Sequence, residues 1–172
     1  ERLLYVGRLS SEKGVDILLH AMAGTNAQLD IVGSGPDEER LRNLAAQLRL
    51  TNVTWHGNKT PDEVAMWMAK ARVLIVPSQW YENYPLVILE AYAQSTPVIG
   101  SRLGGIPEMI RDGKTGALFT ATNVAELRRL IEDTQANPQR WEEMGRTGFT
   151  LLAEHSSARY LEQLLQIYAS VR

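Results

Sequence analysis

The sequence predicts an α/β domain in which helices cover both faces of one parallel sheet. Short apolar, β-branched segments alternate with amphipathic helical segments over the first 120 residues, and this alternation is typical of βαβ units. The short segments are largely apolar, as expected for strands buried on both faces. A chain of 172 residues is long enough for one domain with a sizeable core.

Five strands are predicted where such segments are bounded by Gly, Pro or Ser. They lie at residues 3–6, 29–32, 53–55, 73–76 and 97–100. Five or six parallel strands of this kind form a doubly wound, Rossmann-like sheet, so the expected architecture is a three-layer α/β/α domain.

Helices are predicted between these strands, at residues 14–22, 37–48 and 61–68, and a further helix runs from Pro85 to about Ala93. Thr60 is a suitable N-cap for the third helix, with Pro61 after it and Glu63 in the first turn.

After residue 122 the pattern is helical only. Helices are expected at residues 123–136, from Pro138 onward, and at residues 156–172. The last of these carries an apolar stripe of Leu161, Leu164, Leu165 and Tyr168.

Composition argues against several classes of function. The net charge is −2, the pI is about 6.0 and the cations are scattered, so no nucleic-acid surface is indicated. The absence of cysteine excludes disulfides and thiolate metal sites, and the three histidines are too dispersed to suggest a metal cluster. No apolar segment is long enough to span a membrane. We therefore expect no metal and no membrane span in this chain.

Glycines and charged residues gather where the strands end. The segments after the five strands begin at Gly7, Gly33, His56, Ser78 and Gly100, and they hold many of the Gly, Arg, Lys and Glu residues. The turns that lead into the strands are plainer. Because ligands of parallel sheets bind beyond the C-terminal ends of the strands, we expect the functional site at this edge.

Arg8 and Lys13 lie in one glycine-flanked loop after the first strand. Two cations with room for close approach suit a diphosphate, although the same pattern also fits two solvated loop charges.

Pro85 is expected to open a helix whose first amides, those of Leu86, Val87 and Ile88, have no partner within the helix. Such an end binds anions. Glu82 precedes it and Glu90 lies in its second turn, so the two carboxylates are expected to bracket a phosphate-sized site and to bind sugar or ribose hydroxyls. The alternative is that both are ordinary solvated helix charges.

Three further features are weaker. The Gly33-Ser34-Gly35-Pro36 turn lacks the third glycine of a dinucleotide fingerprint, so we read it as a tight turn approached by a ligand or a neighbouring loop. His56 is interpreted as a structural or rim residue. Trp80 and Tyr81 are expected to line a substrate cleft, with a role as core lids as the alternative.

In combination, these motifs resemble the C-terminal domain of family 4 retaining glycosyltransferases, which have the GT-B fold of two Rossmann-like domains. The matching segments are 7–14, 33–36, 82–91, 97–108 and 113–116, and they include the two-glutamate motif formed by Glu82 and Glu90.

The resemblance implies a role for each site residue. Arg8 and Lys13 would hold the diphosphate of a UDP-, GDP- or ADP-sugar and stabilise it as a leaving group, so that no metal is required. Glu82 would contact the donor sugar and Glu90 the ribose, and Lys59 would lie beside the base. The remaining donor-binding positions would be Gly7, Gly33, Gly35, Asn83, Tyr84, Pro85, Leu86 and Val87.

The sequence departs from the family pattern at Asn83, where a small residue, often Gly, is usual. Asn can adopt positive φ, so binding is expected to persist with a changed sugar pocket.

The resemblance also implies a larger enzyme. Residues 1–172 would be the nucleotide-sugar-binding domain of a hexosyltransferase whose N-terminal acceptor domain is absent, and the isolated chain would be inactive or nearly so. The missing domain would bind a glycan, lipid or small-molecule acceptor, and the last helix would pack against it. Family habits point to polysaccharide or lipopolysaccharide biosynthesis in the cytoplasm, with any attachment to the inner membrane made through the parent protein.

Two other readings remain open. One is a non-catalytic nucleotide-binding or regulatory module, or a sugar-nucleotide epimerase with the GT-B fold, although the His-plus-carboxylate set of an epimerase is not evident. The other is an interaction domain with vestigial motifs, against which the four charged residues Arg8, Lys13, Glu82 and Glu90 argue.

Overall fold

The computed structural model of the chain describes residues 2–152 and Gln166. Its six strands form one sheet: β1 Arg2–Val6, β2 Leu29–Val32, β3 Val53–Trp55, β4 Ala71–Val76, β5 Val98–Ser101 and β6 Gly116–Phe119. The helices are α1 Val15–Met22, α2 Glu38–Gln47, α3 Pro61–Lys70, α4 Leu86–Ala93, α5 Ile106–Met109, α6 Val124–Ala136 and α7 Pro138–Leu151, with a 3₁₀ turn, η1, at Ser11–Lys13.

The sheet is parallel and its strand order is β3-β2-β1-β4-β5-β6. From β1 the chain builds outward to β3, then returns to the centre and builds the other half from β4 to β6. The order therefore reverses between β1 and β4, and loops leaving these two strands diverge to opposite faces. The predicted Rossmann-like α/β/α architecture is confirmed.

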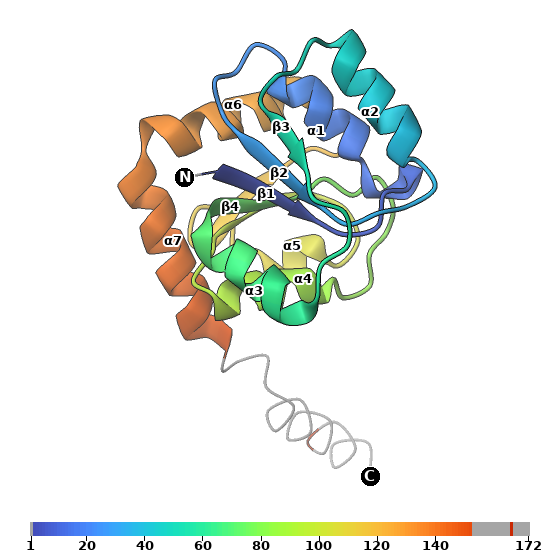
Figure 1. Ribbon diagram of the computed structural model, residues 1–172. Coiled ribbons are helices and arrows are strands. Elements are labelled where there is room, and N and C mark those ends of the chain that lie inside the picture. The colour runs from blue at the N-terminus through green and yellow to red at the C-terminus, as the bar shows by residue number, and fades with distance from the viewer. Residues whose placement is uncertain (1, 153–165, 167–172) are drawn as a thin grey trace.

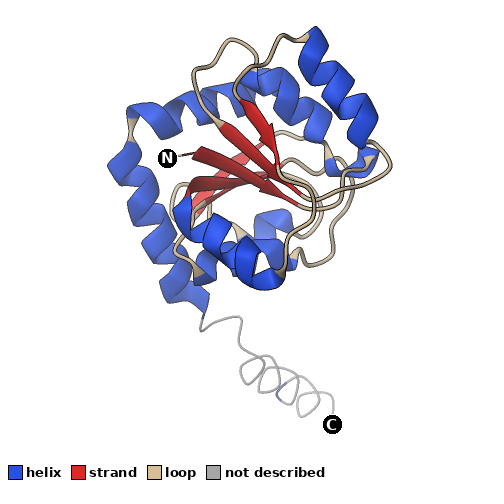
Figure 2. Cartoon of the chain, viewed as in Figure 1, coloured by secondary structure: helices blue, strands red, loops and turns tan. Residues whose placement is uncertain are grey.

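Helices cover both faces of the sheet (Figures 1 and 2). On one face α1, α2 and α6 enclose a core that includes Leu18, Leu41 and Leu127. On the other, α3, α4 and α5 enclose a second core that includes Met68, Ile88 and Ile106.

Helix α7 crosses the edge where the strands begin (Figure 1). Its Trp141 and Met144 belong to the first core, whereas Leu152, just after the helix, packs against the second. This helix therefore closes the N-terminal edge of the sheet and leaves the C-terminal edge open.

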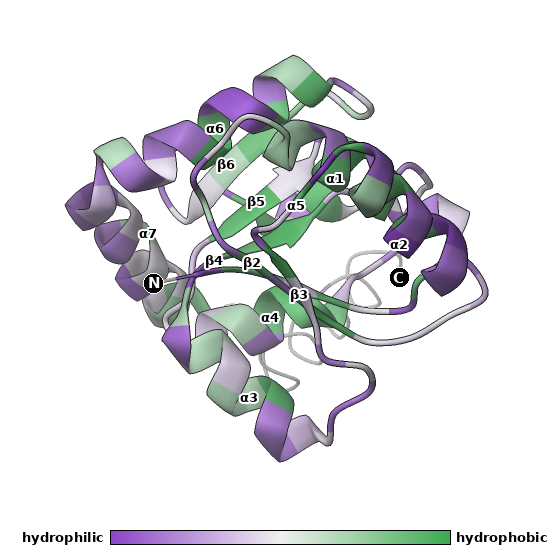
Figure 3. Cartoon of the chain, turned by 45° about the horizontal axis from the view of Figure 1, so that its top comes forward, coloured by the Kyte–Doolittle hydropathy of each residue, from purple (hydrophilic) through white to green (hydrophobic). Residues whose placement is uncertain are grey.

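Hydrophobic residues are concentrated on the strands, whose ribbons are largely green in Figure 3. The buried sequences of β2, β4 and β5 explain this, because a parallel strand covered on both faces has no polar side. Asp30 of β2 is an exception and is treated with the site below.

Most predicted bounds hold to within two residues. The cap of α3 forms as expected: the Thr60 hydroxyl accepts from the Glu63 amide, and the Glu63 carboxylate accepts from the Thr60 amide. The sixth strand, β6, was not located by the sequence analysis, and neither were η1 and α5. The predicted helix at 156–172, with its apolar stripe, lies outside the described residues except for Gln166.

Candidate functional site

A pocket of about 290 Å³ lies at the C-terminal edge of the sheet, where the strand order reverses. It is lined by the end of β1 and its loop, by the end of β4 and its loop, and by the first residues of α4. Doubly wound sheets bind their ligands at such a switch point.

The pocket brings together three of the predicted charged residues, Arg8, Lys13 and Glu82. Lys13 ends the turn η1, and its Nζ donates to Glu82 Oε1 at 2.6 Å. Arg8 is exposed on the loop after β1. Two cations therefore share the pocket with one carboxylate, although the carboxylate lies far from them in the sequence.

Tyr5 also lines this pocket and was not predicted as a site residue. It is only 3% exposed, and its hydroxyl donates to the carbonyl of Arg8 at 2.8 Å. Burial raises the pKa of the Tyr5 phenol well above its usual value, and the negative charges of Glu82 and Glu12 raise it further. Tyr5 is therefore a neutral donor that anchors the Arg8 loop from below.

The start of α4 differs in detail from the prediction. Pro85 is the N-cap rather than the first helical residue, and Leu86 and Val87 line the pocket as expected. The prediction for Ile88 was wrong: its amide donates to the carbonyl of Pro85 at 3.0 Å, in a tight first turn. The amides that remain at this helix end are those of Leu86 and Val87.

The aromatic residues of the preceding loop lie on its surface. Trp80 is 67% exposed and Tyr81 is 70% exposed, and neither they nor Asn83 and Tyr84 line the pocket. Because both rings are largely exposed, neither Trp80 nor Tyr81 covers the core.

Glu90 and Lys59 meet in a second pocket, of about 360 Å³, between α3 and α4. Its wall is largely apolar, with Val64 and Met68 from α3, and it shares the residue Val6 with the first pocket. Glu82 and Glu90 therefore lie in two adjoining pockets and do not bracket a single small site.

Gly33 and Gly35 line neither of these two pockets but hold the loops together. A Cβ on Gly33 would lie 1.9 Å from the carbonyl oxygen of Gly7, and one on Gly35 would lie 2.2 Å from that of Leu9. Of the two interpretations of this turn, the structure shows close approach of a neighbouring loop. The loop that carries Arg8 is consequently fixed against the loop after β2.

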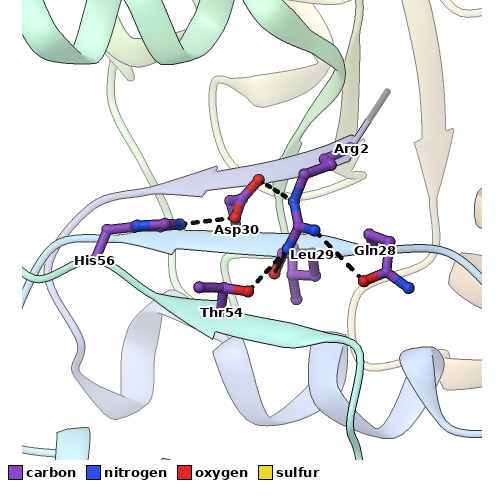
Figure 4. A network of polar contacts seen from close by, with 6 residues as sticks. All are labelled: Arg2, Gln28, Leu29, Asp30, Thr54 and His56. Carbon is purple, nitrogen blue, oxygen red and sulfur yellow. Dashed lines mark hydrogen bonds and ion pairs between the residues drawn. The ribbon is translucent and has the colours of Figure 1, made fainter.

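His56 belongs to a polar network on the sheet (Figure 4). Its Nε2 lies 2.7 Å from Oδ1 of the buried Asp30, whose other oxygen is paired with Arg2. The imidazole also packs against the ring of Trp67. Because the buried carboxylate needs such partners, His56 has a clear structural role.

Within residues 2–152, no group of three His, Cys, Asp or Glu side chains could hold a metal ion. No helix in the described part of the chain is long and apolar enough to cross a membrane.

Comparison with known proteins identifies the family. The model of the family described as "Glycosyl transferases group 1" matches residues 1–150. An uncharacterized glycosyltransferase of Methanocaldococcus jannaschii is 33% identical over 145 residues, and the D-inositol 3-phosphate glycosyltransferase of Streptomyces bingchenggensis is 37% identical over 151 residues. These matches cover 84% and 78% of this chain but only 41% and 33% of the two relatives.

Solved structures agree. Sucrose-phosphate synthase from Thermosynechococcus elongatus aligns with a TM-score of 0.86 and 31% identity, over 98% of this chain and 45% of that one. HepE of Anabaena, solved in complex with UDP-glucose, aligns with a TM-score of 0.85 and 22% identity, over 99% of this chain and 48% of that one. The chain therefore belongs to the glycosyl transferases group 1 family, and its Rossmann-like sheet matches the GT-B glycosyltransferases.

Proposed function

We propose that this chain binds the nucleoside diphosphate sugar from which a retaining glycosyltransferase transfers a hexose. The observation that carries the proposal is the pocket at the strand switch point, where Arg8, Lys13 and Glu82 meet the N-terminal end of α4. The UDP-glucose complex of HepE, a protein of the same fold, adds support.

The proposed roles follow from charge and position. Arg8, Lys13 and the amides of Leu86 and Val87 hold the diphosphate and stabilise the negative charge that it gains as it leaves the sugar. The carboxylate of Glu82 accepts hydrogen bonds from hydroxyls of the sugar. No metal is needed in this arrangement, because the cations and the helix end neutralise the leaving group.

The adjoining pocket suits the nucleoside. Its apolar wall from α3 offers a surface for a base, Glu90 can accept from the two ribose hydroxyls, and Lys59 lies at the rim. Because the two pockets meet at Val6, a single nucleoside diphosphate can occupy both. We propose UDP, GDP or ADP as its nucleotide.

We further propose that a second domain in a longer protein supplies the acceptor site, so that this chain alone transfers little or no sugar. The chain's coverage of about a third to two fifths of the relatives' lengths supports this. Polysaccharide or lipopolysaccharide synthesis at the cytoplasmic face of the inner membrane is the proposed setting.

The first test is a calorimetric and thermal-shift titration with UDP, GDP, ADP and their glucose and mannose conjugates. A ligand present at 100 times its dissociation constant should stabilise the fold by about 2.7 kcal/mol. The Arg8→Ala/Lys13→Ala variant should lose this shift, because it lacks both of the cationic side chains that are proposed to bind the diphosphate.

The matched control is Lys70→Ala/Arg129→Ala, which removes two positive charges from α3 and α6, away from the pocket. It should retain the shift. Equal binding by the two double variants, or no binding of any of these ligands by the wild-type chain, would contradict the proposed site.

A further inference from the structure

The carboxylate of Glu82 is held by two donors that reach the same oxygen. Ser78 Oγ donates to Oε1 at 2.8 Å, and Lys13 Nζ donates to it at 2.6 Å. The other oxygen, Oε2, accepts no hydrogen bond from the part of the chain that the structure describes. One oxygen is therefore committed to the protein and the other is available.

Ser78 is rigidly held. It is 1% exposed, and its carbonyl accepts from the hydroxyl of the equally buried Ser101 of β5 at 2.7 Å. A buried side chain with so little freedom keeps its hydroxyl in one place. The bond from Ser78 to Glu82 therefore holds the carboxylate in a fixed position relative to β5.

The main chain of Glu82 is held by the segment that follows β5. The amide of Gly105 donates to the Glu82 carbonyl at 2.7 Å, and a Cβ on Gly104 would lie only 2.7 Å from that oxygen. The backbone of Glu82 is thus tied to the segment after β5, and its carboxylate is tied through Ser78 to β5 itself.

The two donors differ in how they respond to a diphosphate. Lys13 carries a charge, so an incoming diphosphate competes with Glu82 for its ammonium group. Ser78 is neutral and buried, so its bond to Glu82 is unaffected by that competition. A carboxylate held only by Lys13 would move whenever the lysine turned to the phosphate.

We propose that Ser78 is a positioning residue that holds Glu82 so that its Oε2 faces the hydroxyls of the donor sugar. This assignment rests on the function proposed above. Under this assignment the loops after β1 and β4 have different roles. Lys13 binds the diphosphate, and Ser78 keeps the Glu82 carboxylate directed at the sugar while Lys13 contacts the phosphate.

The test measures what the sugar contributes to binding. UDP, GDP and ADP and the glucose conjugate of each are titrated into this chain by calorimetry, and the tightest-binding nucleotide is kept. The ratio of the Kd of the diphosphate to the Kd of its glucose conjugate is then measured for the wild type, Glu82→Gln, Ser78→Ala and the double variant.

We expect Glu82→Gln and Ser78→Ala each to change this ratio by roughly threefold to tenfold in the same direction, and the double variant to change it no further, because both act through one carboxylate. The Kd of the diphosphate itself should stay within about twofold in Ser78→Ala. A residue that only supported the fold would lower the two affinities together and leave the ratio unchanged.

Thr134→Val is the matched control. The Thr134 hydroxyl is equally buried and donates to the Ile131 carbonyl at 2.7 Å, on α6. Its loss should lower the melting temperature without changing the ratio. If Ser78→Ala does not fold, Ser78→Cys keeps the size of the side chain with a weaker donor and should change the ratio in the same direction.

The outcomes separate the two proposals. If the wild type binds none of the nucleotides, the proposed function fails and this assignment fails with it. If it binds but the ratio is unchanged in Ser78→Ala or in Glu82→Gln, or if the two effects add, the donor site stands and the assignment of Ser78 is wrong.

Discussion

Tyr5 is a single residue whose hydroxyl holds the backbone of Arg8, one of the two cations that we propose bind the diphosphate. The phenol donates to the Arg8 carbonyl from beneath the loop, and its raised pKa keeps it protonated over the whole physiological range. Removing only the oxygen leaves the ring in the core and releases the Arg8 backbone.

We therefore predict that Tyr5→Phe weakens nucleoside diphosphate binding by roughly threefold to tenfold, the value of one hydrogen bond of about 1 kcal/mol. Calorimetry with UDP, GDP and ADP would measure the loss. Tyr92→Phe is the control, because the Tyr92 hydroxyl bonds the Met109 carbonyl of α5 and the Thr115 hydroxyl, and neither residue lines the pocket. Loss of affinity in both variants, or in neither, would show that Tyr5 does not act through the Arg8 loop.

The charged site residues could be predicted from sequence, whereas the hydroxyl donors could not. Lys13 and Glu82 stand out because a charge in a loop after a buried strand needs a reason. Tyr5 lies within an apolar run and Ser78 follows one, so both look like ordinary core residues. Their roles depend on which loops lie side by side, and spacing along the chain does not contain that information.

At the scale of elements, β6 shows why one strand was missed. Its sequence, Gly-Ala-Leu-Phe, has no β-branched residue and begins with glycine, so propensity favours no strand. Pairing with β5 decides the matter: Gly116 lies opposite Val98, and a Cβ there would be 1.9 Å from the Val98 carbonyl oxygen. The strand exists because a tertiary neighbour accepts its backbone.

The contact between the loops after β1 and β2 can be tested with two glycines. Gly33 and Gly24 both have positive φ, but a Cβ on Gly33 would meet the Gly7 carbonyl whereas one on Gly24 would meet nothing within 4 Å. We predict that Gly24→Ala costs about 1 kcal/mol of unfolding free energy, from backbone strain alone. Gly33→Ala should cost at least about 2 kcal/mol more, because the loops must separate.

Urea unfolding followed by tryptophan fluorescence would measure both variants. Gly33→Ala should also weaken diphosphate binding, since it displaces the loop that carries Arg8, and Gly24→Ala should not. If the two alanines cost the same, the close approach of the loops contributes nothing to stability.

For the whole molecule, two buried tyrosines are expected to lower the free energy of unfolding at alkaline pH. Burial raises the pKa of Tyr92 from its ordinary value of 10.0 to about 12, and the pKa of Tyr5 is also raised. Below pH 10 both residues are protonated in the folded and unfolded states. Above it the unfolded chain loses these protons while the folded chain keeps them, so stability falls as the pH rises.

We predict a fall of about 1.4 kcal/mol per pH unit for each of the two tyrosines above pH 10. Urea unfolding at a series of pH values would give the slope. The Tyr92→Phe variant should lose one of the two contributions and show a shallower fall up to about pH 12. Identical slopes for the variant and the wild type would rule out Tyr92 as a source.

The fold class could be predicted because buried strands and amphipathic helices alternate along most of the chain. The class would still be recognised if one helix or strand were assigned wrongly. The strand order follows only from the expected Rossmann-like class, whose usual order is 3-2-1-4-5-6, because the apolar segments themselves do not indicate that β1 and β4 are neighbours. That adjacency joins Arg8 and Lys13 to Glu82 in one pocket and separates Glu90 into the next.

The loops of the C-terminal edge are joined backbone to backbone. Gly33 lies against Gly7, Gly14 against Pro77, and Gly105 against Asn83, so that the loops after the neighbouring strands β2, β1, β4 and β5 contact one another in series. Gly24 and Gly113, in turns that lead into strands, have open space around them. Changing the ligand of the candidate site should therefore require exchange of side chains with the loop lengths kept, whereas tags or fused peptides should be tolerated at residues 24 or 113.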